Sequence, residues 1–306
     1  MRVYRARALG AFVVTTSVVD GAADPATGAA TPAGRLSVLK LGGSVLRDDR
    51  AYATAARFLQ TRLSVNPHER LVVIVSAQYG TTDYLLAEAQ IIANEPSPLA
   101  LDLLWSTGEL RSVAILALHL QKIGVSAVPF NVHQAGLVAN PGGGTSVRPN
   151  RLRAALAHAR IVIVPGFLGV SAGDAVTSLG RGGSDLTAVL LAGSIRAGAC
   201  ELVKDVRGYF TADPHQRSDA TPIHDLTFDD ALAMADAGCD LVQRAALAAA
   251  SDAGLRLVIR SMDAAASITT VHSRDHSQDR SQDHSRSRSS HGVRHQDDSR
   301  RPAAGV

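Results

Sequence analysis

Residues 36–76 read LSVLKLGGSVLRDDRAYATAARFLQTRLSVNPHERLVVIVS, in which two short apolar runs flank a longer helical pattern. The runs at 36–41 and 71–76 are apolar almost without interruption, which is typical of strands covered on both faces. The segment 48–64 between them has the pattern of a helix. A strand, a helix and a second strand in this order predict two parallel strands joined by a crossover helix.

The same alternation continues to residue 271. Further strands are predicted at 125–130, 159–166, 200–205 and 255–260, and further helices at 83–94, 99–122, 149–158, 184–196, 227–237 and 242–253. We therefore expect an α/β fold, a three-layer αβα sandwich with a mainly parallel central sheet. Because ligands bind at the carboxyl ends of the strands in such sheets, the loops after the strands are the candidate site.

The two ends of the chain have a different composition. Residues 1–35 begin with basic residues and an apolar run that superficially resembles a secretory signal, but Thr15, Thr16 and Ser17 interrupt it. We expect a disordered extension or linker there. Residues 272–306 alternate Arg, Asp, His and Ser, so they are expected to form a disordered tail that cannot bury enough apolar surface to fold.

Composition and charge exclude several classes of partner. The chain has 306 residues and a formal net charge of only +3, which makes no case for a nucleic-acid partner. No apolar segment is long enough to span a membrane. Cys200 and Cys239 are not in a CxxC motif, and two reduced thiols are favoured over a disulfide. These features favour a cytoplasmic protein.

Two glycine-rich loops carry charged residues. In VLKLGGSVL, residues 38–46, Lys40 ends a strand and precedes Gly42 and Gly43, a pattern that suits an anion but also an ordinary strand-to-helix turn. In LGRGGSDLTAVLLAG, residues 179–193, Arg181 offers a bidentate fork for a carboxylate, and Asp185 could accept hydrogen bonds from an amine. A simple salt bridge between Arg181 and Asp185, beside a cap by Ser184, is the alternative.

Two further loops carry hydroxyl and carboxylate groups. Ser76 and Thr82 belong to a hydroxyl-rich turn after the strand at 71–76, and Asp83 could cap the next helix. Glu109 follows Gly108 and shares a helical face with Ser112. Glu109 is either a solvated acid near a helix start or a ligand for a substrate ammonium.

Taken together and in order, these loops resemble the amino acid kinase family, and within it the aspartate kinases. The motifs that carry the resemblance are KLGGS, VSAQYGTTDYL, STGELRS, VPGFLG, TSLGRGGSDLTAVLLA and KDVRGYFTADP, between about residues 37 and 262. The first and fourth recur across the family, whereas the long arginine-glycine-aspartate motif and the last motif are much more specific to aspartate kinases.

The resemblance implies a role for each matching residue. It implies that Lys40, Gly42 and Gly43 cradle the phosphates of ATP, with Lys40 and Asp185 as catalytic residues and Mg²⁺ as cofactor. It implies an L-aspartate site containing Arg181 at the α-carboxylate, together with Ser76, Thr82, Glu109 and Asp185. The nucleotide loop would contribute Lys204, Asp205, Phe210 and Asp213. The resemblance also implies an acceptor-binding N-lobe, a nucleotide-binding C-lobe and a homodimer.

The reaction implied is transfer of the γ-phosphoryl group of ATP to the β-carboxylate of L-aspartate. That carboxylate is already ionised at pH 7, so the attack requires no general base. It requires alignment of two anions and cancellation of their charge, which Lys40, backbone N–H groups and Mg²⁺ can supply. No dedicated protein site for the metal is expected, because Mg²⁺ is commonly held by phosphates and water.

The sequence departs from the aspartate-kinase pattern in four places. Lys204 replaces the usual threonine before Asp205, and Asp240 stands where a nucleotide-contacting lysine is expected. The form KLGGSVL is closer to other members of the family, and the pattern of small regulatory ACT domains does not follow residue 271. Feedback inhibition through such domains is therefore not expected. A different carboxylate or phosphate acceptor, or a non-catalytic nucleotide-binding protein, remains the alternative.

Overall fold

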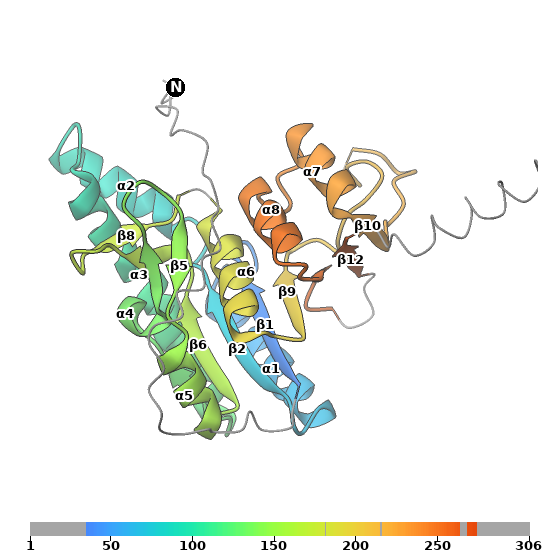
Figure 1. The fold of residues 1–306 in the computed structure, drawn as a ribbon, viewed down its shortest axis with the longest axis horizontal. Coiled ribbons are helices and arrows are strands. Elements are labelled where there is room, and N and C mark those ends of the chain that lie inside the picture. The colour runs from blue at the N-terminus through green and yellow to red at the C-terminus, as the bar shows by residue number, and fades with distance from the viewer. Residues whose placement is uncertain (1–34, 181, 215, 264–267, 274–306) are drawn as a thin grey trace, which may run out of the picture. The chain divides into compact units, whose positions relative to one another are not determined.

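The computed structural model describes residues 35–180, 182–214, 216–263 and 268–273, and it has the predicted α/β architecture (Figure 1). By its contacts the chain divides into two units, Met1–His272 and Ser273–Val306. Every helix and strand below belongs to the first unit. The predicted extension at 1–35 and the predicted tail at 272–306 lie almost entirely outside the described residues.

The central sheet has eight strands in the order β10-β12-β11-β9-β1-β2-β6-β3. Every neighbouring pair is parallel except β11 and β12. The strands are β1 (Leu36–Leu41), β2 (Arg70–Val75), β3 (Val128–Pro129), β6 (Ile161–Pro165), β9 (Ala199–Val203), β10 (Asp225–Thr227), β11 (Leu257–Arg260) and β12 (Thr269–His272).

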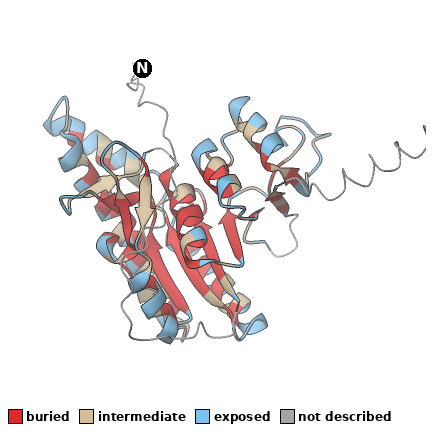
Figure 2. Cartoon of the chain, viewed as in Figure 1, coloured by how far each residue is buried: buried red, intermediate tan, exposed pale blue. Residues whose placement is uncertain are grey.

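Helices cover both faces of this sheet, which gives the three predicted layers (Figure 1). They are α1 (Asp49–Val65), α2 (Thr81–Ile92), α3 (Pro98–Lys122), α4 (Val132–Ala135), α5 (Asn150–His158), α6 (Gly183–Ile195), α7 (Phe228–Asp236) and α8 (Arg244–Asp252). Along β2, Leu71 and Val73 belong to the core beneath α1 and α3, whereas Val72 and Ile74 belong to the core beneath α6. From Leu71 onward the strand is therefore apolar because it is buried on both faces, as Figure 2 shows for the centre of the sheet.

A second sheet of four short strands was not predicted. It has the order β5-β4-β7-β8 and comprises β4 (Leu137–Ala139), β5 (Thr145–Val147), β7 (Leu168–Val170) and β8 (Val176–Ser178). Strands of three residues are too short to show a periodic pattern, so this sheet left no signal in the sequence.

Two local predictions were wrong at their boundaries. The strand predicted at 125–130 contains only Val128–Pro129, which form the edge of the sheet, where a proline without an N–H is tolerated. The helix predicted to begin near Asp83 begins at Thr81, after Gly80 in the left-handed conformation (φ 76°), so Asp83 lies in the first turn and does not cap the helix. None of the described helices is long and apolar enough to cross a membrane.

Candidate active site

Three neighbouring parallel strands bring three of the predicted loops together. The order β9-β1-β2 places the ends of these strands side by side, with Lys40 opposite Leu202 in the β1–β9 ladder. Lys40 is near the end of β1, Ser76 follows β2 directly, and Lys204 follows β9 directly. The loops after these strands therefore meet at one edge of the sheet, as predicted.

Asp185 lies between two lysine side chains. It is in the first turn of α6, where the helix N-terminus favours a negative charge. Its Oδ1 atom lies 2.8 Å from Lys40 Nζ, and its Oδ2 atom accepts a hydrogen bond of 2.9 Å from Lys204 Nζ. Burial alone would raise the pKa of Asp185, but the two ammonium groups hold it below its usual value. Both carboxylate oxygens are therefore engaged by lysines, so a substrate ammonium would have to compete for them.

Lysine is rare in this protein, which makes the pairing more informative. Of the 31 Lys and Arg residues only three are lysines, namely Lys40, Lys122 and Lys204. Two of the three are buried against one carboxylate. Burial and the neighbouring Lys40 charge lower the pKa of Lys204, although Asp185 opposes the shift. A compact ammonium can pair with a single carboxylate oxygen and still present N–H groups to another anion, which the planar guanidinium of Arg does less readily.

Close backbone packing explains the glycines of this region. A Cβ atom on Gly43 would lie 2.9 Å from the carbonyl oxygen of Ala77, and one on Gly42 would lie 3.0 Å from Lys40 Nζ. A Cβ atom on Gly166 would lie 2.6 Å from Ser184 Oγ, which itself accepts a hydrogen bond of 3.0 Å from Ser76 Oγ. The glycines thus let the loops after β1, β2 and β6 approach α6. Ser184 does not cap α6, because Gly182 occupies the cap position without a side-chain hydrogen bond.

Glu109 is a buried carboxylate with a free acceptor. It lies in α3 with 3 % of its surface exposed, and its Oε2 atom has no hydrogen-bond partner among the described residues. Burial raises its pKa to about 8, while a backbone hydrogen bond from Ala77 and the charge of Lys40 oppose the shift only in part. Gly108 lets Thr81 and Ala77 pack closely beside it. Such an acceptor is costly to bury unless a ligand satisfies it.

Asp205 is held by two residues that the sequence analysis did not single out. Ser44 Oγ donates a hydrogen bond of 3.0 Å to Asp205, and Arg47 lies 3.1 Å from the same carboxylate. The Arg47 guanidinium also lies over the ring of Tyr79. Ser44 was detectable because it follows the glycine pair directly, whereas Arg47 had no distinguishing pattern. These contacts join the loop after β1 to the loop after β9.

The remaining predicted residues are less closely joined to this cluster. Thr82 is half-buried at the start of α2, and its carbonyl accepts a hydrogen bond from Trp105. Phe210 forms an isolated bridge with Pro222, and Asp213 is exposed and accepts a hydrogen bond from Gln216. Arg181 lies outside the described residues.

The exposed Asp240 lies in the loop before α8, whose cap residue Gln243 packs directly against Gly182. In the part of the chain that the structure describes, no group of three or more His, Cys, Asp or Glu side chains is arranged to hold a metal ion.

The chain is similar in sequence to known proteins of one family. The profile of the amino acid kinase family matches residues 35–261. An aspartokinase from Mycobacterium tuberculosis is 40 % identical over 213 residues, which are 68 % of this chain and 50 % of that protein. An aspartokinase from Geobacillus stearothermophilus is 38 % identical over 229 residues, which are 73 % of this chain and 56 % of that protein. The chain thus spans about half the length of the curated relatives it matches.

Solved structures show the same similarity. The aspartate kinase from Synechocystis superposes with a TM-score of 0.70 at 32 % identity, covering 78 % of this chain and 40 % of that one. The aspartokinase III of E. coli, solved with aspartate and ADP, superposes with a TM-score of 0.68 at 25 % identity, covering 79 % of this chain and 66 % of that one. The matched profile spans most of the residues that form the sheet and all of the clustered loops, so this chain belongs to the amino acid kinase family.

Proposed function

We propose that this protein is an aspartate kinase that transfers the γ-phosphoryl group of ATP to the β-carboxylate of L-aspartate. The observation that carries the proposal is the buried Asp185 held by Lys40 and Lys204 beside a glycine loop, with the unsatisfied Glu109 close enough for the charge of Lys40 to act on its pKa. The relatives named above are aspartokinases, and the E. coli relative was solved with aspartate and ADP.

The phosphate side of the site would consist of Lys40, Gly42, Gly43 and Lys204. Lys40 and Lys204 converge on Asp185, so their ammonium groups are held close together at the edge of the sheet. Two adjacent cations suit the β- and γ-phosphates, whose negative charge must be neutralised during transfer. Asp185 would then be a positioning residue that keeps both lysines charged and aligned.

The acceptor side would consist of Glu109, Ser76, Thr82 and Arg181. Glu109 would bind the α-ammonium of aspartate through its unsatisfied oxygen, and the substrate's charge would favour the ionised carboxylate. Arg181 would hold the α-carboxylate by a bidentate contact. Ser76 and Thr82 would contribute hydroxyl groups. These roles follow from the arrangement of the elements, because β1, β2 and α6 surround the expected position of the acceptor.

The chemistry needs positioning and charge neutralisation. An oxygen of the β-carboxylate forms a bond to the γ-phosphorus while the bond to the β–γ bridging oxygen breaks, giving an acyl phosphate and ADP. No proton moves to or from the protein. Mg²⁺ would enter as part of the MgATP substrate, which neutralises phosphate charge. The protein's part is to align the two anions with Lys40 and Lys204.

The adenosine side would involve the loop after β9. Asp205, Phe210 and Asp213 would border the nucleoside, with Asp205 held in place by Ser44 and Arg47. Lys204 would supply the cation that Asp240 does not provide.

The decisive test is an acyl-phosphate assay. Purified protein is incubated with L-aspartate, ATP, Mg²⁺ and hydroxylamine, and aspartyl hydroxamate is measured beside an aspartokinase control. We expect product that depends on L-aspartate, ATP and Mg²⁺ and is lost in Lys40→Met. A parallel panel of other amino acids, carboxylates and phosphorylated acceptors tests the alternative acceptors. Turnover with another acceptor, or none with aspartate, would overturn the proposal.

We also propose a cytoplasmic homodimer. The cytoplasm supplies ATP and keeps thiols reduced, and Cys200 is a free cysteine. The outer surfaces of α2 and α3 expose large apolar side chains, including Tyr84, Ile91, Ile92, Leu99 and Leu103. Exposed apolar side chains of this number on two neighbouring helices support the proposal of an association surface there. Light scattering should give twice the chain mass, and Leu103→Asp together with Ile91→Asp should give the monomer mass.

A further inference from the structure

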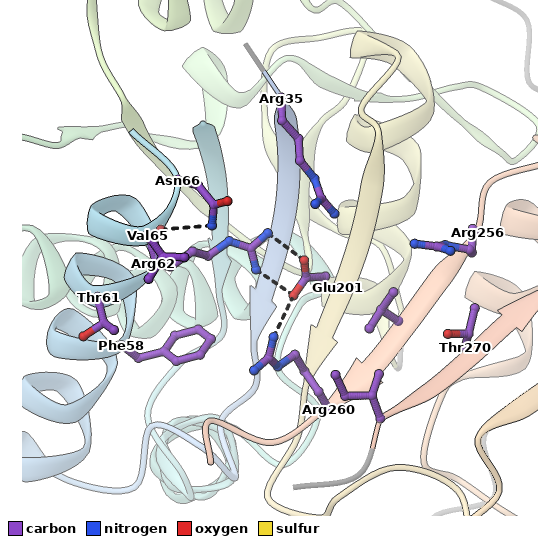
Figure 3. A pocket seen from close by; sticks show the side chains of 12 residues that line it. Arg35, Phe58, Thr61, Arg62, Val65, Asn66, Glu201, Arg256, Arg260 and Thr270 are labelled. Carbon is purple, nitrogen blue, oxygen red and sulfur yellow. Dashed lines mark hydrogen bonds and ion pairs between the residues drawn. The ribbon is translucent and has the colours of Figure 1, made fainter. Parts of the chain in front are cut away.

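A pocket lies on the face of the sheet opposite the candidate active site. Its volume is about 490 Å³, and α1, β9, β11 and β12 line it together with Arg35, which precedes β1 (Figure 3). Along β9, Cys200 and Leu202 belong to the core beneath α6, so Glu201 between them points to the opposite, α1 face. Lys40 and Asp185 lie on the α6 face. The sheet therefore separates this pocket from the lysine cluster.

Arginine dominates the pocket. The side chains of Arg35, Arg62, Arg256 and Arg260 approach Glu201 from different sides, as Figure 3 shows. Arg62 donates two hydrogen bonds of 2.7 Å to Glu201 and further hydrogen bonds of 2.8 and 2.9 Å to the buried Glu69. The carboxylates are thus largely satisfied by Arg62 alone.

The other arginines have weaker contacts or none. Arg260 lies 3.7 Å from Glu201 and stacks on Phe58. Arg35 lies 3.8 Å from Glu69, and 56 % of its side chain is exposed. Arg256 is exposed and makes no ion pair or hydrogen bond within the described part of the chain. Four guanidinium groups against two carboxylates leave an excess of two positive charges, carried mainly by Arg35 and Arg256.

The remaining lining fits a small molecule with an apolar part. Phe58, Val258 and Ile268 supply apolar surface, and Thr61 and Thr270 supply hydroxyl groups. The volume lies within the range of small-molecule pockets. The chain's own C-terminal segment has the wrong charge to fill it, since residues 274–306 contain seven Arg and five Asp. An anionic ligand from solution suits the pocket better.

We propose that this pocket is a second ligand site, which binds a small molecule with two or more oxyanionic groups. Arg35 and Arg256 hold these groups by the paired N–H donors that match carboxylate and phosphate oxygens. The Arg62–Glu201 pair forms the floor, and the apolar part of the ligand lies against Phe58 and Val258. The site is distinct from the proposed kinase site, and its existence does not depend on that function.

The test is calorimetric titration of the protein saturated with a non-hydrolysable MgATP analogue and L-aspartate. Two probes separate the possible sources of the oxyanion: tricarballylate carries carboxylates, and fructose 1,6-bisphosphate carries phosphates. We expect saturable 1:1 binding of at least one probe, weakened tenfold or more in the double variant Arg35→Gln, Arg256→Gln.

Arg151→Gln is the matched control for the single variant Arg256→Gln, because each removes one positive charge from an exposed position. The single variant Arg256→Gln should bind the probe more weakly and keep the wild-type melting temperature. Its weaker binding then cannot come from misfolding. The proposal would be overturned if neither probe bound saturably, or if Arg151→Gln weakened binding as much as the pocket variants do. If the analogue and aspartate fail to bind, the proposed kinase function is in question, yet the same titration of the unliganded protein still tests the pocket.

Discussion

Glu109 should make aspartate binding depend on pH. Its pKa of about 8 means that the carboxyl is mostly protonated at pH 7 and ionises as the pH rises. Only the ionised form attracts the substrate ammonium by charge. We expect the KM for L-aspartate to fall roughly tenfold between pH 7 and pH 9, while the substrate ammonium stays largely protonated. Steady-state kinetics across this range measure the slope.

Glu109→Gln is the control for this prediction. The amide keeps the size and polarity of the side chain but does not ionise. We expect a raised KM for aspartate and no slope with pH in this variant. If the variant kept the wild-type slope, another group would be responsible.

Lys204 is a second single residue from which we expect a measurable effect, in this case on catalysis. Lys204→Met removes one of the two cations on Asp185 and leaves a buried carboxylate oxygen without its hydrogen bond. We expect kcat to fall on the order of 100-fold and the KM for MgATP to rise, since one charge at the phosphates is lost. Lys122→Met, at the exposed end of α3, is the matched control and should be neutral. Equal activity of the two variants would contradict the role of Lys204.

At the scale of elements, replacement by alanine should impair substrate binding at one glycine and stabilise the fold at another. Gly43→Ala places a methyl group 2.9 Å from the Ala77 carbonyl, so the loop after β1 must shift away from the loop after β2. We expect a KM for MgATP raised on the order of tenfold. Gly193 lies inside α6 with its nearest neighbour, Ala253 Cβ, at 3.9 Å. Gly193→Ala should stabilise the protein by roughly 0.5–1 kcal/mol, because alanine favours a helix interior.

Thermal melting and kinetics of both variants test this pair. A wild-type KM in Gly43→Ala would mean that the loop adapts without cost to the site. A lower melting temperature in Gly193→Ala would mean that the space beside α6 is smaller than the contact distance indicates.

At the scale of the whole molecule, Arg62 joins elements distant in the sequence. It connects α1 to Glu69, just before β2, and to Glu201 in β9, 139 positions away. Both carboxylates are buried, so removing the guanidinium takes away their short hydrogen bonds and leaves only the more distant Arg35 and Arg260 as cationic partners. Arg62→Ala should therefore destabilise the protein by about 3–5 kcal/mol. Arg57→Ala, at an exposed position of the same helix, should change stability little.

The pH dependence distinguishes this electrostatic cause from lost packing. In the wild type, burial alone would raise the pKa of Glu69, but Arg62 outweighs this effect and lowers it. The ionised Glu69 therefore stabilises the fold at pH values above the ordinary glutamate pKa, and this stabilisation is lost as the pH falls. Without Arg62, burial dominates and protonation favours the folded state. Chemical denaturation should therefore show a smaller difference between variant and wild type at pH 5 than at pH 8. A constant difference would indicate packing alone.

The sequence determined the layers and the loops that form the site. Continuous apolar runs predicted β1, β2, β6 and β9 to within two residues, because a strand buried on both faces needs such a run. The loops after β1 and β2 followed from the rule that parallel strands place their carboxyl ends together, whereas Glu109 lies inside α3 and not in a loop. The short second sheet left no such pattern, since strands of three residues are too short to show a period.

Only the tertiary structure decided which charges meet. Lys40, Asp185 and Lys204 come from three separate segments, and no spacing rule predicts that two lysines share one aspartate. The unsatisfied oxygen of Glu109 and the excess arginines around Glu201 likewise depend on which side chains the packed elements bring together. Periodicity is a local property that a sequence records directly, whereas burial and the partner of a charge are set by the whole fold.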